Sequence, residues 1–292
     1  YDTIKIFILL VTINYVMAAT RHFLPVQKIR DILTKRKWYG ADYLLASLFG
    51  VITPFCSCSS IPLFVGFLSA GIPLGVTLAF LITSPLVNEA SIAIFIGIFG
   101  LQTTLLYVAS GVIIGTVGGI LLGKMKLENS IDDSLRAIIA KKPVAQNIQQ
   151  SKVPLSSLLI QFWHEGWEIT KSIFLYVVVG VGVGAIIHGY LPVGFFEKYL
   201  ANGNWWSVPL ATILAVPLYS NAVGVIPVMQ VLVSKGVPLG TALSFMMATV
   251  GLSFPEALIL KKAMKPRLLY SFFITVTLGI MLIGTAFNLL SK

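Results

Sequence analysis

The chain has 292 residues, of which 57% are hydrophobic and only 11% are charged. A soluble domain of this length could not bury so much apolar surface in one core, so the composition excludes a soluble enzyme and predicts an integral membrane protein. The formal net charge is +10. Because the basic residues stand in short clusters between apolar segments, this charge fits cytoplasmic loops beside anionic lipid and gives no support to nucleic-acid binding.

Residues 1–123 read as a first transmembrane repeat, with an apolar helix at each end and two interrupted apolar stretches between them. Within residues 38–123 the only formally charged side chains are Asp42 and Glu89. This span can cross a hydrocarbon layer of about 30 Å several times at roughly 20 residues per helix. The outer helices of the repeat are expected at about 4–20 and 103–123.

Residues 124–170 carry charges of both signs and separate the first repeat from a second apolar region. A helix start is expected near Ser130, with apolar residues along one face. We predict a cytoplasmic or interfacial linker lying on the membrane surface, in preference to a regulatory arm.

Residues 171–292 read as a second transmembrane repeat that is a diverged copy of the first. Its outer helices are expected at about 170–189 and 268–289. An offset of 165 residues brings Pro62, Gly71 and Pro73-Leu74-Gly75 onto Pro227, Gly236 and Pro238-Leu239-Gly240.

The basic residues predict opposite orientations for the two copies. The loop after the first helix is basic in copy one, whereas its counterpart after residue 188 has Lys198 as its only Lys or Arg. Before the last helix the bias reverses, because residues 90–104 carry no charge and copy two is basic there. The predicted fold is an all-α polytopic protein of the inner (cytoplasmic) membrane, built from two inverted repeats. Each repeat has about four to five transmembrane or re-entrant helices, broken by prolines at the midplane.

The sharpest local signal is Thr-Pro-Phe-Cys-Ser-Cys-Ser-Ser-Ile-Pro at residues 53–62. The two prolines predict that this run is partly unwound, and in an extended backbone Cys56 and Cys58 would share a face. Irregular backbone at membrane depth survives only where protein or a water-filled cavity satisfies its polar groups. The run therefore predicts a binding site.

Thiolates are soft ligands, so Cys56 and Cys58 suit trivalent arsenic, another soft metal species or a sulfur compound. The alternative is a pair of inert, buried cysteines that act as small apolar side chains. The hydroxyls of Ser57 and Ser59 and the flanking prolines favour a functional site. A thiol oxidoreductase is a weaker reading, because electron relay across a membrane would normally need a second pair of cysteines and the chain has two in all.

Copy two keeps the prolines at the corresponding place but has Tyr219, Ser220 and Asn221 instead of thiols. The expected site is therefore asymmetric, with soft ligands from one copy and hydrogen-bonding groups from the other. The alternative is that Ser220 and Asn221 only cap a broken helix.

A second motif comes after the second break of each copy. An ionisable group inside a bilayer marks a substrate or proton path by default, although a carboxylate also stabilises the start of a helix. We expect these residues to serve coupling or to shape the site: Ser84, Pro85, Asn88, Glu89, Ser253 and Glu256. The sequence shows no phosphate-binding loop, metal cluster or catalytic triad, so we expect neither an enzyme nor a cofactor.

The cysteine run, the later Gly-Ile-Pro-Leu-Gly and the run Thr-Ser-Pro-Leu-Val-Asn-Glu resemble the predicted permease family that includes the ArsP organoarsenical efflux permeases. The resemblance covers most of the chain. It implies an inner-membrane permease, with some members exporting trivalent arsenicals through cysteine thiols. It also implies that Cys56 and Cys58 form the pair, within a motif that includes Ser57, Pro85, Asn88 and Glu89.

The sequence therefore predicts a secondary permease that moves a small thiophilic solute, with efflux of trivalent arsenicals or a related soft species as the leading hypothesis. The alternatives are a channel or importer for a sulfur-containing anion and a membrane thiol-disulfide oxidoreductase. The expected partners are a small-molecule or ion substrate and the lipid bilayer, and no nucleic acid. A homo-oligomer is compatible with the sequence.

Overall fold

The computed structural model describes residues 40–53, 57–125, 127–131, 206–218, 222–261 and 263–290. These residues are helical, apart from turns and one isolated bridge between Ile131 and Met264, which confirms the all-α prediction. The predicted first helix of each repeat and most of the linker fall outside the described residues, so the repeat boundaries stay predictions. The helices are α3 (Ala41–Ile52), α4 (Ser57–Ser69), α5 (Leu74–Leu86), α6 (Glu89–Lys124), η1 (Leu127–Ser130), α10 (Ser207–Ala215), α11 (Ala222–Ser234), α12 (Leu239–Gly251), α13 (Phe254–Leu260) and α14 (Pro266–Leu290).

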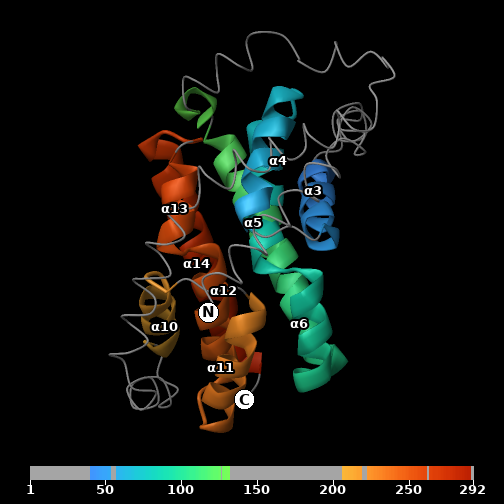
Figure 1. The fold of residues 1–292 in the computed structure, drawn as a ribbon, viewed down its shortest axis with the longest axis vertical. Coiled ribbons are helices and arrows are strands. Elements are labelled where there is room, and N and C mark those ends of the chain that lie inside the picture. Colours follow the sequence, from blue (N-terminus) through green and yellow to red (C-terminus); the bar gives the residue numbers. More distant parts are fainter. Residues whose placement is uncertain are drawn as a thin grey trace, which may run out of the picture.

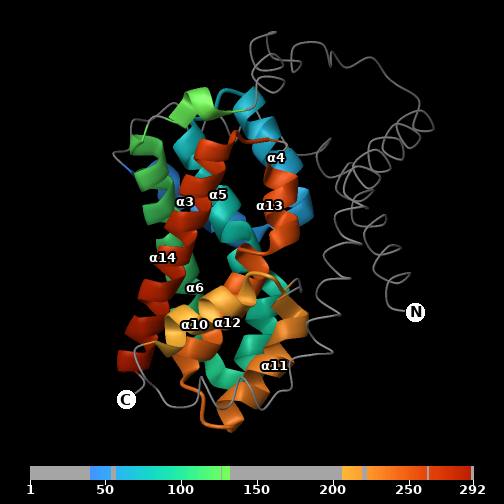
Figure 2. The same ribbon diagram turned by 90° about the vertical axis from the view of Figure 1, so that its left-hand side faces the viewer.

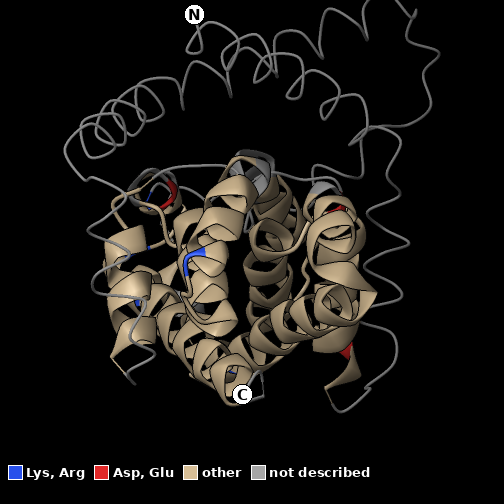
Figure 3. Ribbon diagram, turned by 90° about the horizontal axis from the view of Figure 1, so that it is seen from below, with Lys and Arg blue, Asp and Glu red and all other residues tan. Residues whose placement is uncertain are grey.

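The described helices have the length and surface of membrane-spanning elements. Three stretches are long and apolar enough to cross a bilayer, namely Ser91–Lys124, Leu239–Leu258 and Pro266–Leu289. Along α14 an exposed stripe with four-residue spacing contains Tyr270, Ile274, Leu278 and Leu282. Such a stripe suits contact with lipid. Figure 3, seen from below, shows how few charged residues the described helices carry.

Helix α6 turns back on itself at Gly100, where the backbone has φ 80° and ψ 169°. In a continuous helix, Phe95 and Tyr107 would be about 18 Å apart along the axis. Their rings are instead stacked, with centroids 4.6 Å apart. Residues 89–99 therefore form a short helix, and residues 101–124 form the long helix that crosses the membrane.

The same packing unit occurs once in each half of the chain. The start of α5 packs on the end of α6, since a Cβ added to Gly119 would lie 2.8 Å from the Gly75 carbonyl oxygen. In the same way, a Cβ added to Gly284 near the end of α14 would lie 2.9 Å from the carbonyl oxygen of Gly240 in α12. Close helix packing through glycine is common between membrane helices.

The two units point in opposite directions. The Ser130 carbonyl, just after α6, accepts a 2.8 Å hydrogen bond from the Lys265 amide, just before α14. The end of α6 and the start of α14 thus lie at the same end of the molecule, and the two long helices run antiparallel (Figure 1). That the two halves are inverted copies of one repeat stays a prediction.

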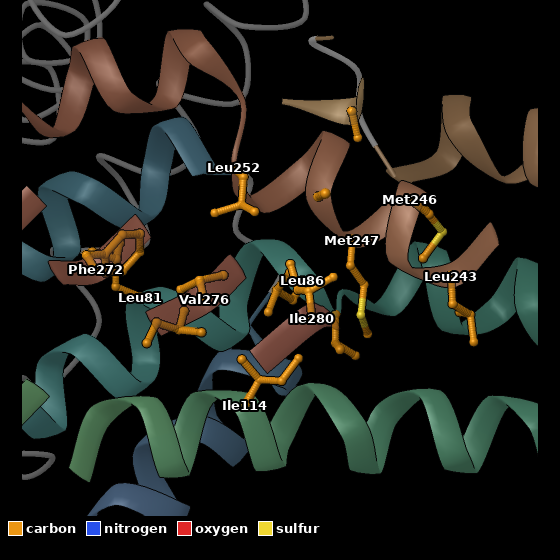
Figure 4. Close-up of a cluster of buried hydrophobic side chains, with 14 of the residues drawn as sticks. Leu81, Leu86, Ile114, Leu243, Met246, Met247, Leu252, Phe272, Val276 and Ile280 are labelled. Carbon is orange, nitrogen blue, oxygen red and sulfur yellow. The ribbon is translucent and has the colours of Figure 1, made fainter. Parts of the chain in front are cut away.

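A shared apolar core joins the halves between these units. It contains Leu86 and Ile114 from the first half and Met247, Leu252 and Ile280 from the second, all buried (Figure 4). Helix α5 contacts α12, and α6 contacts α14. Each half therefore buries its apolar surface against the other.

The helix break at the cysteine run agrees with the predicted partial unwinding. Helix α3 ends at Ile52, before Pro54, and α4 begins at Ser57 with Pro62 as its sixth residue, so the two prolines do not lie in one continuous helix. Proline removes one backbone hydrogen bond and its ring clashes with the carbonyl four residues earlier. In α4 that carbonyl belongs to Cys58, in the first turn, so the disturbance falls at the end of the helix and leaves the rest of it intact. Pro227 holds the same sixth place in α11.

Candidate functional site

The breaks between the short helices converge on one region of the molecule. In the first half, Ser60 in the first turn of α4 bonds to Ser84 in the last turn of α5, with 2.8 Å between the hydroxyl oxygens. At the other side of this region, a Cβ added to Gly251 at the end of α12 would lie 2.8 Å from Leu86 Cδ2 at the end of α5. The start of α4 and the ends of α5 and α12 are therefore neighbours.

Two short helices of the second half contact helices of the first half. Helix α13 of the second half packs against α4 of the first, and α11 of the second half packs against α6 of the first. Figure 2 shows α4 and α13 beside each other in the upper part of the molecule. Each of these two short helices of the second half therefore packs against a helix of the first half.

The cysteine run lies at the first of these breaks. Helix α3 ends at Ile52, and the hydroxyl of Thr53 donates a 2.8 Å hydrogen bond to the carbonyl of Phe49. Cys56 lies outside the described residues. The backbone of Cys58 belongs to the first turn of α4, while the structure describes no side chain within residues 57–59. That the two thiols face a common site stays a prediction, as does the role of Ser57 and Ser59.

The second-copy run also falls at a break, since α10 ends at Ala215 and α11 begins at Ala222. Tyr219, Ser220 and Asn221 themselves lie outside the described residues. Their place in a binding site is therefore untested.

The second motif of copy one forms a helix cap. The side-chain oxygen of Asn88 accepts hydrogen bonds from the amide and the hydroxyl of Ser91, each 2.8 Å long. Both bonds fix the start of α6, in the way that asparagine commonly caps helices. Ser84 is buried and Pro85 lies inside α5, one residue from its end. Asn88 thus shapes the break.

Two residues at this break were missed by sequence reasoning. The Tyr107 hydroxyl donates a 2.6 Å hydrogen bond to the carbonyl of Leu86, and Ser91 completes the cap described above. Tyr107 is fully buried. In the sequence, Tyr107 shows only as a tyrosine within an apolar helix. Its hydrogen bond to Leu86 depends on the reversal of the chain at Gly100, which the sequence does not reveal.

The two carboxylates do not occupy the same helical position. Glu89 is the first residue of α6 and is exposed, whereas Glu256 is the third residue of α13 and only 2% exposed. Ser253, just before α13, is also buried, and its hydroxyl makes no hydrogen bond within the part of the chain that the structure describes.

The remaining candidate ligands are few. Among the residues with described positions, no group of three or more His, Cys, Asp or Glu side chains could hold a metal ion. The thiols of Cys56 and Cys58 lie outside this set.

Comparison with known proteins gives a family match over almost the whole chain. The ArsP family model, described as a predicted permease, matches residues 1–289. A UPF0718 protein of Methanocaldococcus jannaschii is 19% identical over 315 residues, covering 86% of each chain. No solved structure matches the chain.

Proposed function

The chain belongs to the ArsP predicted permease family and is a membrane permease, and from this premise we propose that it is a secondary permease for a small thiophilic solute. The leading candidates are trivalent arsenicals or a related soft species, moved outward across the inner membrane. Cys56 and Cys58 would bind the solute, because thiolates are the soft ligands among side chains.

The observation that carries this proposal is the meeting of broken helices from both halves. The break between α3 and α4 and the first turn of α4 together contain the only two cysteines of the sequence. That first turn lies beside the end of α5, and the end of α5 in turn touches the end of α12. Helix breaks inside a membrane protein commonly form substrate sites, because freed backbone groups and helix ends can contact the solute. Ser57 and Ser59 would supply hydroxyls at the same turn.

Alternating access is consistent with the inverted units. The α5–α6 and α12–α14 units share their packing and point in opposite directions. Helices α4 and α11 have equal length, each is followed by a glycine in the left-handed region, and the two turns lie 165 residues apart. In such a protein, rocking of one repeat against the other exposes a central site to each side in turn. The proton gradient or the gradient of the solute would drive this motion.

The site would be asymmetric. Copy two would contribute Tyr219, Ser220 and Asn221, which bind through hydrogen bonds instead of sulfur. Two roles remain for the second motif: Asn88 and Ser84 hold the helix ends in place, and Glu89, exposed at the start of α6, is a candidate for coupling.

The orientation in the membrane is inferred from the basic residues. Lys124 lies at the end of α6, and Lys261, Lys265 and Arg267 lie between α13 and the first turn of α14. The Ser130–Lys265 bond places these elements at one end of the molecule. By the positive-inside rule, this end faces the cytoplasm.

The proposal is tested by growth of cells that lack their own arsenic export. They would express the wild type, the Cys56→Ser/Cys58→Ser variant, or Ser69→Ala, a control at the far end of α4 whose hydroxyl bonds to Val65 in the same helix. We expect the wild type and the control to protect cells against methylarsenite, arsenite or antimonite, and the cysteine variant to lose this protection at equal amounts in the membrane.

Other outcomes identify the alternatives. Equal growth of all strains in every condition would remove thiophilic efflux. Thiosulfate uptake that survives the cysteine substitutions would favour the sulfur-anion importer. Quinone reduction coupled to thiol oxidation in the purified protein would favour the oxidoreductase.

A further inference from the structure

Glu89 is a charged side chain that lies about halfway between the two ends of the membrane-spanning part. A Cβ added to Gly111, in the long part of α6, would clash with Val87, two residues before Glu89. At roughly 1.5 Å of rise per residue, Gly111 lies about 15 Å from the start of this long helix and about 20 Å from its end. Glu89 therefore lies deep within a hydrocarbon layer of about 30 Å.

The carboxyl group of Glu89 is exposed at this depth, and another residue caps the helix. The flanking Val87 and Ser91 are buried, whereas Glu89 is exposed. Asn88 provides the cap of α6, because its side-chain oxygen accepts the hydrogen bond of the Ser91 amide. Within the described part of the chain, the Glu89 carboxyl group forms no ion pair. An ionised carboxyl group at this depth costs free energy unless water or an opposite charge stabilises it.

The exposed face of α6 continues from Glu89 to the end of the short helix. Ala93, Ile96 and Gly97 are exposed and follow at intervals of three or four residues, so they share one side of the helix with Glu89. A Cβ added to Gly97 would meet nothing within 4 Å. The face ends at the turn at Gly100, at the end of the molecule away from the basic residues assigned to the cytoplasm.

We infer that this face lines a water-filled path from the outer side of the membrane to Glu89, and that Glu89 carries the proton that drives export. The second part rests on the proposed function. The carboxylate takes up a proton from the outer side and releases it to the cytoplasm after the molecule has changed its access. One proton thus moves inward for each solute that moves outward, and no other reactant is needed.

The titratable groups around Glu89 leave it as the carboxyl group at mid-depth among the described residues of these helices. Helices α5 and α11, which pack against α6, contain no titratable side chain. The other titratable groups of α6 and of its neighbours α3 and α14 are Asp42, Tyr43, Tyr107, Lys124, Arg267 and Tyr270. Tyr43 touches the position of Gly123, so the start of α3 lies at the cytoplasmic end, where α14 also begins. Tyr107 lies near the break and donates its hydroxyl hydrogen bond to Leu86.

The water path is tested by thiol labelling, which requires no transport. Both native cysteines are first replaced by Cys56→Ser/Cys58→Ser. Single cysteines are then introduced by Glu89→Cys, Ala93→Cys and Gly97→Cys, with Leu278→Cys as the control. Leu278 is 55% exposed on the apolar face of α14 and stands 12 residues from each end of that helix, so it matches the depth of Glu89.

Spheroplasts expose the outer side of the membrane to a charged, membrane-impermeant methanethiosulfonate, which reacts with thiolates in water. We expect the three cysteines on α6 to be labelled and Leu278→Cys to stay unlabelled. Failure to label Ala93→Cys and Gly97→Cys would overturn the path.

The role of the proton is tested by accumulation of methylarsenite in everted vesicles, whose lumen corresponds to the outer side. Valinomycin with equal K⁺ on both sides holds the membrane potential at zero, and the lumen is set one pH unit more acidic than the medium. For one proton per solute, this gradient supports about tenfold more accumulation than no gradient. We expect this gain in the wild type and its loss in Glu89→Gln.

Two variants control for the loss of charge and for folding. Asp42→Asn makes the same carboxyl-to-amide change at the cytoplasmic end of α3 and should keep the gain. Glu89→Asp retains a carboxyl group and should keep it as well. Size-exclusion chromatography measures the folded fraction of each variant.

The outcomes separate this inference from the proposed function. A tenfold gain in Glu89→Gln, or methylarsenite transport by the wild type that ignores the pH gradient, would overturn the proton role alone. No methylarsenite transport by the wild type would overturn the proposed function and the proton role with it. The labelling result decides the water path in either case.

Discussion

Replacing Gly119 by alanine should destabilise the protein by forcing α5 and α6 apart. The added Cβ would lie 2.6 Å from the Cβ of Ala79 and 2.8 Å from the carbonyl oxygen of Gly75. Carbon atoms in contact prefer about 3.5–4.0 Å, so the helices must separate by about 1 Å. Overpacking of this kind costs about 1–3 kcal/mol, from which the better helix propensity of alanine recovers about 0.5–1 kcal/mol.

Gly97→Ala provides the control, because it makes the same chemical change in the short helix of residues 89–99. A Cβ at Gly97 meets nothing within 4 Å. It should therefore gain the helix propensity without a clash, so the two variants should differ by about 1–3 kcal/mol.

The assay is thermal unfolding of the purified chain in detergent, with size-exclusion chromatography to measure the folded fraction. At about 2–4 °C per kcal/mol, Gly119→Ala should unfold several degrees below Gly97→Ala. Equal midpoints for the two variants would show that α5 and α6 are not in close contact at this glycine, and would refute the packing described above.

Three further predictions concern the helix breaks. Tyr107→Phe keeps the ring stack but leaves the buried carbonyl of Leu86 without its donor, so it should lower the free energy of unfolding by about 1–3 kcal/mol in the same assay. The control is Tyr270→Phe in α14, which should have no measurable effect because Tyr270 is 68% exposed. Asn88→Ala removes the cap of α6 and should cost about 1 kcal/mol, and Asn88→Asp should restore most of it; equal stability of all three would argue against the cap. In a double-mutant cycle, Ser60→Ala and Ser84→Ala should show a coupling of about 0.5–1.5 kcal/mol, and additive effects would mean that the two hydroxyls do not interact.

The membrane class and the positions of the breaks could be predicted from sequence because their causes are local. A chain with this excess of apolar residues cannot fold as a soluble protein, and a proline lacks a backbone N–H donor at any position in the sequence. The breaks before α4 and α11 were therefore expected. Glu89 and Glu256 were likewise expected near helix starts, and both lie in first turns.

The features that the sequence could not predict depend on contacts between distant residues. Gly100 is one of several glycines in an apolar run, and only the packing of Phe95 on Tyr107 shows that the chain reverses there. The different burial of Glu89 and Glu256 could not be predicted from the aligned motifs either, because it depends on the helices that pack against α6 and α13. The continuation of α4 through Pro62 is a third feature that the sequence did not predict. A proline in the second turn of a helix disturbs only the hydrogen bonds at its start.

The site could be predicted only in part for the same reason. The cysteine run was recognisable from its prolines and thiols, but its neighbours come from three other helices. Ser60 and Ser84 meet across 24 residues, and Leu86 meets Gly251 across the whole linker. No pattern within either segment encodes those pairings.

The most direct test of the proposed function is transport of methylarsenite into everted membrane vesicles by the wild type and by Cys56→Ser/Cys58→Ser. Everted vesicles expose the cytoplasmic face, so an exporter should accumulate the arsenical inside. The wild type should show saturable accumulation, and the cysteine variant, present in equal amount, should fall to the level of vesicles without the protein. Equal accumulation by both would contradict a thiol-lined path through the broken helices.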